Sequence, residues 1–265
     1  FWVLKIGYAI FSIEVNDRLN FFGIIMTAVS KTQAKYSSSN SKLSAYKDLY
    51  AGKVSNLSFL LFEFYQLVVM PLPGLLGFGL RAFWAKFIFG KAGKSPAIGK
   101  HVSIRGPKGI RLGSGVIVEE FSSLDCRDGE ISLGDKVFIG RGSIIASKTA
   151  TITLENGVNI GSECRIATET SLKIGESTLV AAYCYIGPGN HASDDISRPI
   201  IEQEMIHAGG VKIGSGCWIG TRVTILDGVT IGNGAIIGAH SLVTTDVPEN
   251  GVAVGAPAKV IRTRS

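Results

Sequence analysis

An aliphatic residue recurs at every sixth position through much of the second half of the chain. In the clearest stretch the recurring residues are Ile213, Ile219, Ile225, Ile231, Ile237 and Val243, and a small or β-branched residue follows each of them four positions later. A period of six fits neither the 3.6-residue turn of a helix nor the two-residue alternation of an ordinary strand. Internal repeats of this kind indicate a solenoid, in which each repeat packs only on its neighbours.

The same six-residue pattern occurs upstream in groups of three. The groups begin at Leu112, Leu133, Leu154 and Ile174, so their starts lie 21, 21 and 20 residues apart. We interpret three short strands as one turn of a triangular prism, with extra residues at one corner. Each aliphatic residue and the small residue four positions later then point inward, and the glycine that often follows the aliphatic residue allows a tight corner. The pattern predicts a mainly β fold, a parallel β-helix over residues 98–262.

The four cysteines fit this interpretation as core residues. Cys126, Cys164, Cys184 and Cys217 form no CxxC pair and no zinc-finger spacing, so we expect no metal site. Three of them occupy the small inward position of a repeat. We therefore predict buried thiols in a reducing compartment, and no cysteine nucleophile.

The N-terminal part has a different composition. We expect residues 1–57 to be an N-terminal segment and polar linker, partly helical or mobile, without a clean signal-peptide cleavage site. Residues 58–97 are predicted to form a hydrophobic, amphipathic helical region, because an apolar run is interrupted by Pro71 and Pro73 before Arg81 and Lys86 follow among aromatic residues. Three interpretations stand: a segment lying in a membrane interface, a cap over the open end of the solenoid or a subunit contact, and a helix that spans the membrane.

The repeat is interrupted once, between Pro188 and Val211. This excursion, over residues 188–210, begins near His191 and also contains Asp194 and Asp195. A long insertion in a regular solenoid is usually functional. Trp218 lies just after the repeat resumes.

These residues carry a resemblance. The run from Val211 to Arg262, VKIGSGCWIGTRVTILDGVTIGNGAIIGAHSLVTTDVPENGVAVGAPAKVIR, together with GNH at 189–191, resembles the hexapeptide-repeat acetyltransferases of the maltose, galactoside and xenobiotic type. The N-terminal run LPGLLGFGLRAFW is similar to bacterial O-antigen and exopolysaccharide acetyltransferases. The resemblance implies a left-handed β-helix, a homotrimer with active sites in the grooves between subunits, and acetyl-CoA as acyl donor.

The resemblance also implies roles for particular residues. His191 matches the histidine that takes the proton from an acceptor hydroxyl as its oxygen attacks the thioester directly. Trp218 matches a tryptophan that packs against the acetyl and pantetheine end of the cofactor. The remaining matches to CoA-binding positions are Thr221, Ala239, Thr244, Thr245, Lys259 and Arg262, of which Thr245 replaces the lysine common in relatives. Weaker candidates for the acceptor site are Tyr183, Tyr185, Asp194 and Asp195.

The formal net charge of +6 fits an anionic partner such as a CoA phosphate or an acidic membrane surface. No arginine-rich segment interleaved with aromatic residues is present, so we do not expect nucleic acid as a partner. We expect a carbohydrate or lipid-linked sugar as acceptor and a cytoplasmic location, peripheral on the inner face of the membrane.

Two other functions are kept open. The same prism serves γ-class carbonic anhydrases, which need three histidines on zinc, and this chain has His101, His191, His207 and His240. A non-catalytic, membrane-tethered trimeric scaffold is the second alternative.

Overall fold

The computed structural model describes residues 41–187 and 189–265. Residues 1–40 of the predicted N-terminal segment and polar linker lie outside these residues. The contacts divide the chain into two compact units: Phe1–Tyr46 with His191–Ile206, and Lys47–Asn190 with His207–Ser265. The second unit holds the repeats and the first holds most of the excursion.

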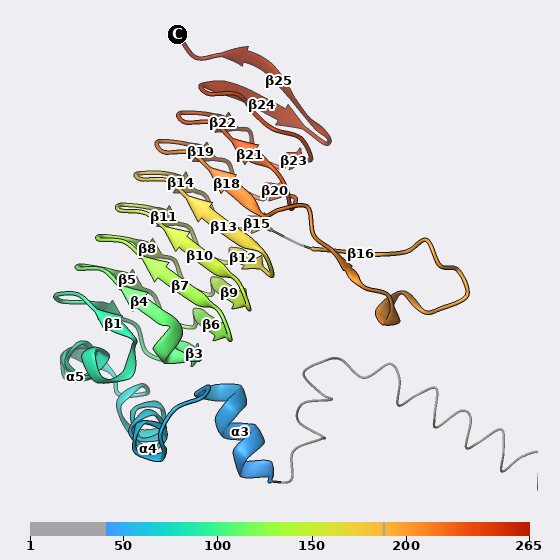
Figure 1. Cartoon of the computed structure of the whole chain (residues 1–265). Coiled ribbons are helices and arrows are strands. Elements are labelled where there is room, and N and C mark those ends of the chain that lie inside the picture. The colour runs from blue at the N-terminus through green and yellow to red at the C-terminus, as the bar shows by residue number, and fades with distance from the viewer. Residues whose placement is uncertain (1–40, 188) are drawn as a thin grey trace, which may run out of the picture. The chain divides into compact units, whose positions relative to one another are not determined.

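The second unit is a parallel β-solenoid of about seven turns, which confirms the predicted fold (Figure 1). Three parallel sheets run along it, and we call them A, B and C. Sheet A consists of β1 (Lys91–Ala92), β4 (Ile110–Leu112), β7 (Glu130–Leu133), β10 (Thr151–Leu154), β13 (Ser171–Ile174), β18 (Val211–Ile213) and β21 (Thr230–Ile231). Sheet C consists of β3 (Ser103–Arg105), β6 (Ser123–Arg127), β9 (Ile144–Lys148), β12 (Arg165–Thr168), β15 (Tyr185–Ile186), β20 (Thr224–Ile225) and β23 (Leu242–Val243).

Sheet B continues beyond the last full turn into a C-terminal hairpin. Its strands are β2 (Ala97–Ile98), β5 (Ile117–Val118), β8 (Phe138–Ile139), β11 (Asn159–Ile160), β14 (Leu179–Val180), β19 (Trp218–Ile219), β22 (Ile236–Ile237), β24 (Gly251–Gly255) and β25 (Ala258–Thr263). All neighbours pair in parallel except β24 and β25, which are antiparallel. The first solenoid strand, β1, begins at Lys91, ahead of residue 98.

The interior is a stack of aliphatic side chains, as the six-residue period predicts. Leu133, Leu154 and Ile174, which begin three of the predicted groups, lie in register on three successive strands of sheet A, and all three are buried. The small residues four positions on are buried as well, including Cys164, Cys184 and Cys217. Each turn therefore contributes the same apolar layer, and burial of these layers is the main stabilising contribution of the solenoid.

The glycines of the repeat also permit close packing of adjacent turns. A Cβ atom on Gly113 would lie 2.5 Å from the carbonyl carbon of Gly134 on the next turn, so these glycines permit close approach of adjacent turns. The left-handed conformation occurs two residues later. Glycine adopts it at some corners, such as Gly115, Gly142 and Gly216, and side-chain-bearing residues such as Arg222 and His240 adopt it at others.

Helices precede the first turn. They are α3 (Lys42–Tyr50), α4 (Asn56–Phe64), a π-helical segment η1 (Tyr65–Val69) and α5 (Gly74–Ile88), and a 3-10 turn, η2 (Pro107–Gly109), follows within the solenoid. The Ser55 hydroxyl caps α4 by accepting a hydrogen bond from the Ser58 amide at 3.2 Å. Phe62, Tyr65 and Ile88 belong to the same buried cluster as Ile98 of β2. These helices therefore close the core at its N-terminal end. Among the described residues, no helix has both the length and the apolar character needed to cross a bilayer.

The excursion leaves the solenoid after β15 and returns at β18. It contains a two-stranded sheet of β16 (Asn190–His191) and β17 (Met205–Ile206), with a 3-10 turn, η3 (Ile200–Glu202), between them. The Ala192 amide donates a hydrogen bond to the Glu204 carbonyl oxygen at 2.8 Å and extends the pairing. The interruption predicted from the sequence is thus an ordered hairpin with its own internal bonding.

Candidate functional site

Sheet B carries a row of residues that joins Trp218 to the C-terminal hairpin. Trp218 of β19 pairs with Ile236 of β22, Ile236 pairs with Val252 of β24, and Val252 pairs with Arg262 of β25. Three strand spacings separate Trp218 from Arg262, a span of roughly 14 Å. The Trp218 side chain is 52% exposed, and Arg262 is exposed. The row therefore has an aromatic side chain at one end and a guanidinium at the other.

Lys259 adds a second cation to the same end of the row. It pairs with Val254, and the register of the hairpin shifts between Val252 and Ala253. Because Val252 and Val254 point to one side of β24, their partners Arg262 and Lys259 share a side as well. Two solvent-accessible positive charges on one face provide what a phosphate group requires.

Thr221 and Ala239 occupy the same corner on successive turns. The Thr221 carbonyl oxygen accepts a hydrogen bond from the His240 amide at 2.9 Å, and its hydroxyl donates one to the Ala182 carbonyl oxygen at 2.8 Å. A Cβ atom on Gly220 would lie 2.6 Å from the Ala239 nitrogen, so glycine is required for this contact. The Thr221 hydroxyl therefore holds the corner together, while Ala239 is exposed.

The two tyrosines predicted near the acceptor are exposed on the preceding turn. The Arg222 guanidinium lies 5.3 Å from the centroid of the Tyr183 ring, a cation–π contact between adjacent turns. Tyr185 lies on β15, next to Thr224 of β20. Thr244 and Thr245 are exposed beyond the end of β23. These positions are accessible to a ligand, but the described contacts do not select one.

His191 is exposed at the end of β16, in the smaller unit. The pairing of β16 with β17 sets the direction of the backbone that carries it. Within residues 41–187 and 189–265, no hydrogen bond, ion pair or ring contact involves its imidazole. The imidazole is therefore presented to solvent by an ordered hairpin.

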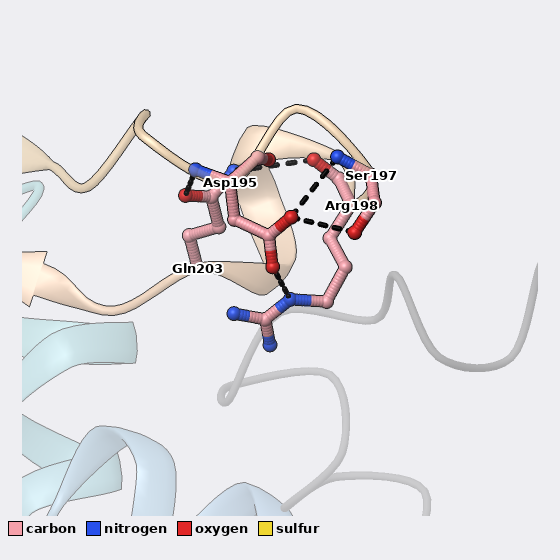
Figure 2. Close-up of polar contacts among 4 residues, drawn as sticks. All are labelled: Asp195, Ser197, Arg198 and Gln203. Atoms are coloured by element: carbon pink, nitrogen blue, oxygen red, sulfur yellow. Dashed lines mark hydrogen bonds and ion pairs between the residues drawn. The ribbon is translucent and has the colours of Figure 1, made fainter.

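Asp195 organises the tip of this hairpin, and Figure 2 shows the contacts. Its carboxylate accepts hydrogen bonds from the Ser197 hydroxyl at 2.6 Å and amide at 3.0 Å, and from Arg198 Nε at 2.7 Å. The Gln203 side-chain amide donates to the Asp195 carbonyl oxygen at 2.8 Å. These contacts, led by the Ser197 hydroxyl and Arg198, lower the pKa of Asp195 to about 2. Its carboxylate is already used within the loop, whereas Asp194 is exposed.

Sequence reasoning missed Asp227, which binds the returning end of the excursion. Its two carboxylate oxygens accept hydrogen bonds from the Ala208 amide at 2.7 Å and the Gly210 amide at 2.8 Å. The Gly228 amide in turn donates to the Gly210 carbonyl oxygen at 2.9 Å. Asp227 sits in an ordinary repeat, TILDGV, and a six-residue period carries no signal for a contact with an insertion.

Cys126 and Cys217 are poor candidates for chemistry. Burial raises the pKa of Cys126 to about 11, and it also raises the pKa of Cys217. A thiol that stays protonated is a weak nucleophile. Within the described residues, no group of three or more His, Cys, Asp or Glu side chains could hold a metal ion.

An open pocket of about 410 Å³ lies near the other end of the solenoid. Residues of α5, β2 and β5 line it, with Phe78, Ile117, Glu120 and Arg141 among them. It does not include Trp218 or the C-terminal hairpin.

Comparison with known proteins places the chain among acetyltransferases. The family described as bacterial transferase hexapeptide (six repeats) matches residues 210–245. A probable acetyltransferase of Mycobacterium tuberculosis is 36% identical over 164 residues, which are 62% of this chain and 52% of that protein. The putative lipopolysaccharide biosynthesis O-acetyl transferase WbbJ of Escherichia coli is 34% identical over 170 residues, 58% of this chain and 87% of that protein. The match therefore spans about half of the mycobacterial relative and most of the E. coli one.

Among solved structures, AntD resembles the chain with a TM-score of 0.49. AntD is an N-acyltransferase from Bacillus cereus, crystallised with dTDP and 3-hydroxybutyryl-CoA. It is 21% identical, and the match covers 68% of this chain and 86% of AntD.

Proposed function

This chain belongs to the hexapeptide-repeat acetyltransferases, and we propose that it moves an acetyl group from acetyl-CoA to a hydroxyl of a sugar, with His191 as general base. The family membership rests on the E. coli relative, most of which is matched at 34% identity. The relatives named as an acetyltransferase and as an O-acetyl transferase of lipopolysaccharide biosynthesis support an acetyl donor and a sugar acceptor, and the chemistry of the row on sheet B supports the donor.

The observation that carries the proposal is the row from Trp218 to Arg262. Acetyl-CoA has an uncharged acyl and pantetheine arm at one end and a phosphorylated nucleotide at the other. An exposed indole suits the arm, and the paired cations Lys259 and Arg262 suit the phosphates. Thr221, Ala239, Thr244 and Thr245 are the remaining contacts that we assign to the donor.

His191 supplies the base in this proposal. Its imidazole takes the proton of the acceptor hydroxyl as the oxygen attacks the thioester carbonyl carbon, and the collapsing intermediate releases the CoA sulfur. The imidazolium then returns the proton to the thiolate, so CoA leaves as the free thiol and the base is regenerated. Base catalysis of this kind contributes roughly 10²–10⁴-fold to the rate. The exposed position of His191 on an ordered hairpin supports an encounter with the hydroxyl of the acceptor.

The acceptor and the assembly belong to the same proposal. The E. coli relative is named for lipopolysaccharide biosynthesis, which supports a sugar of a surface polysaccharide or glycolipid as acceptor. We assign Tyr183, Tyr185, Asp194 and Asp195 to the acceptor side, with Asp195 acting through the shape of the loop. We propose a homotrimer with active sites between subunits, working in the cytoplasm on the inner face of the membrane.

Two alternatives have less support. A carbonic-anhydrase-like centre needs a cluster of histidines, and the described residues contain no candidate group. A scaffold without activity does not account for two cations placed in line with an exposed tryptophan. The acetyltransferase relatives favour catalysis over both alternatives.

The test is release of the CoA thiol from acetyl-CoA, with and without an oligosaccharide acceptor. We expect acceptor-dependent release in the unmodified protein and a loss of roughly 10²-fold or more in His191→Ala, with acetyl-CoA affinity retained. His207→Ala is the matched control, because His207 is an exposed histidine of the same excursion. Unchanged transfer in His191→Ala would refute the base assignment. Absence of acceptor-dependent release with every sugar tested, despite donor binding, would favour the scaffold.

A further inference from the structure

The N-terminal helices expose an unusually large set of apolar side chains. We call this set the apolar face. It consists of ten exposed residues on α4, η1 and α5: Leu57, Leu60, Phe64, Leu67, Val68, Leu75, Leu76, Phe78, Phe83 and Phe87. Scattered surface leucines need no explanation, but a contiguous apolar patch on a soluble surface marks an interaction site. We propose that the apolar face docks on the surface of a lipid bilayer that contains anionic lipids.

Aromatic contacts make the face continuous across the two helices. The ring centroids of Phe64 on α4 and Trp84 on α5 lie 5.3 Å apart, and those of Trp84 and Phe87 lie 5.9 Å apart. Phe83 and Phe87 are 5.7 Å apart. The exposed rings of Phe64, Phe83 and Phe87 are therefore connected through the half-buried ring of Trp84.

The face is held in place by the opposite sides of the same helices. Phe62, Tyr65 and Ile88 are buried against the first turns of the solenoid. Arg81 is also buried, and its guanidinium donates hydrogen bonds to the carbonyl oxygens of Ile98 and Leu72, each at 2.6 Å. The apolar face is therefore the side of these helices that does not pack against the core. The packing of the buried side holds it in place.

The chemistry of the face fits a bilayer better than a protein partner. Between residues 56 and 88, the only exposed residues with polar side chains are Asn56 and Lys86. A protein interface typically carries about one hydrogen bond per 100–200 Å², so it needs donors and acceptors that this surface does not offer. The hydrocarbon boundary of a bilayer requires none.

Charge around the face indicates which lipids it meets. The Lys86 ammonium lies 4.6 Å from the centroid of the Phe83 ring and 4.9 Å from that of Phe87, so a cation is held at the rim of the apolar surface. Lysines in this position extend to lipid headgroups while their stems cover apolar surface. Residues 47–97 contain six Lys or Arg and two Asp or Glu. The exposed cations among them, Lys53, Lys86, Lys91 and Lys94, complement anionic headgroups.

This inference rests on the proposed function for its purpose, because a bilayer surface is where a lipid-linked sugar acceptor resides. The evidence for the docking surface and for the lipid class does not depend on His191. Binding to membranes can therefore be measured without measuring acetyl transfer.

The experiment is co-sedimentation of the full chain with vesicles. Phosphatidylcholine vesicles are compared with vesicles of phosphatidylcholine and phosphatidylglycerol. We expect binding to the anionic vesicles that weakens with added salt, because screening reduces the lysine contribution. Leu67→Glu and Leu75→Glu should each weaken binding by at least about tenfold. Each replaces an exposed leucine that becomes buried in the lipid on binding.

Leu43→Glu is the matched control. Leu43 lies on α3 outside the apolar face and is 67% exposed, against 79% for Leu67. It should bind vesicles like the unmodified protein. Far-UV circular dichroism and thermal unfolding verify that each variant is folded, and Leu67→Gln repeats the test without a new charge.

Three results would overturn the proposal. They are no binding of the unmodified chain to either vesicle, unchanged binding by both folded face variants, and self-association in solution that Leu67→Glu abolishes. The last result would assign the face to a second copy of the chain. The CoA thiol-release assay separates a failure of the docking proposal from a failure of the proposed function. Vesicle binding without acetyl transfer removes only the enzyme assignment, and transfer without vesicle binding removes only the docking face.

Discussion

The Nε atom of Arg81 donates a hydrogen bond to the carbonyl oxygen of Ile98 at 2.6 Å. Nη1 of the same guanidinium donates to the carbonyl oxygens of Leu72, at 2.6 Å, and Met70, at 3.3 Å. Arg81 is 4% exposed. One buried side chain therefore joins α5, the turn before α5 and the first strand of sheet B.

Replacing Arg81 with methionine should destabilise the helical cap. The substitution keeps much of the side-chain bulk but leaves buried carbonyl oxygens without donors, and each such loss costs about 1–3 kcal/mol. We expect the free energy of unfolding in urea to fall by about 3 kcal/mol. Lys86→Met is the control, because Lys86 is exposed on the same helix. Equal stability of the two variants would show that the guanidinium contacts contribute little.

Arg81 also shows where sequence reasoning reached its limit. A basic residue among aromatic ones predicted a charged side of an interfacial helix, whereas the structure buries it against carbonyl oxygens. By contrast, the solenoid followed directly from the six-residue period. Leu133, Leu154 and Ile174 must stack if strands of adjacent turns pair in register, and they do.

The contacts of the excursion were not predictable in the same way. Local patterns report which face of a repeat is buried, but they do not report a contact between an insertion and a distant repeat. Asp227 lies 17 residues from Gly210 in the chain and binds its amide. The row from Trp218 to Arg262 likewise depends on the register shift in the hairpin, which no periodicity encodes.

The loop tip around Asp195 should respond to acid and not to neutral pH. Hydrogen bonds from the Ser197 hydroxyl and Arg198 lower the pKa of Asp195 from 3.8 to about 2. A lowered folded-state pKa contributes stability above the ordinary pKa, and that contribution is lost as the pH falls towards the folded-state pKa. We expect the loop to be unchanged from about pH 8 to pH 5 and to loosen progressively below about pH 4.

The measurement is an NMR titration that follows the Asp195 carboxyl carbon and the Arg198 Nε signal. Asp195→Asn is the control, since it removes the titrating group and should abolish the linked change at Arg198. A midpoint for Asp195 at or above its ordinary pKa would contradict the bonding pattern of the loop.

Asp227 should control the order of the returning segment of the excursion. Its carboxylate accepts two backbone amides, those of Ala208 and Gly210, so Asp227→Ala removes both partners. We expect hydrogen exchange at these two amides to accelerate by about tenfold or more, which corresponds to a loss of about 1.4 kcal/mol in local stability. Asp246→Ala is the matched control, because Asp246 accepts the Thr230 amide on another turn.

If Asp227 positions the hairpin that carries His191, Asp227→Ala should also lower kcat. The affinity for acetyl-CoA should stay near that of the unmodified protein. Retained protection at Ala208 and Gly210 in Asp227→Ala would contradict the anchoring role. A fall in donor affinity with unchanged kcat would place Asp227 on the donor side.

Arg262 should recognise the 3′-phosphate of the donor. Arg262 and Lys259 share a side of the C-terminal hairpin, in line with Trp218. Arg262→Met removes one charge-assisted contact, so we expect acetyl-CoA affinity to fall by about tenfold, equivalent to about 1.4 kcal/mol. The donor lacking its 3′-phosphate should bind the unmodified protein with the same deficit and should be insensitive to Arg262→Met. Calorimetry with both donors measures the coupling between charge and phosphate directly. Lys212→Met, an exposed lysine of sheet A, should change neither affinity. An equal loss for both donors in Arg262→Met would mean that Arg262 supports the hairpin and not the phosphate, and Lys259 would then be the cation to test at that position.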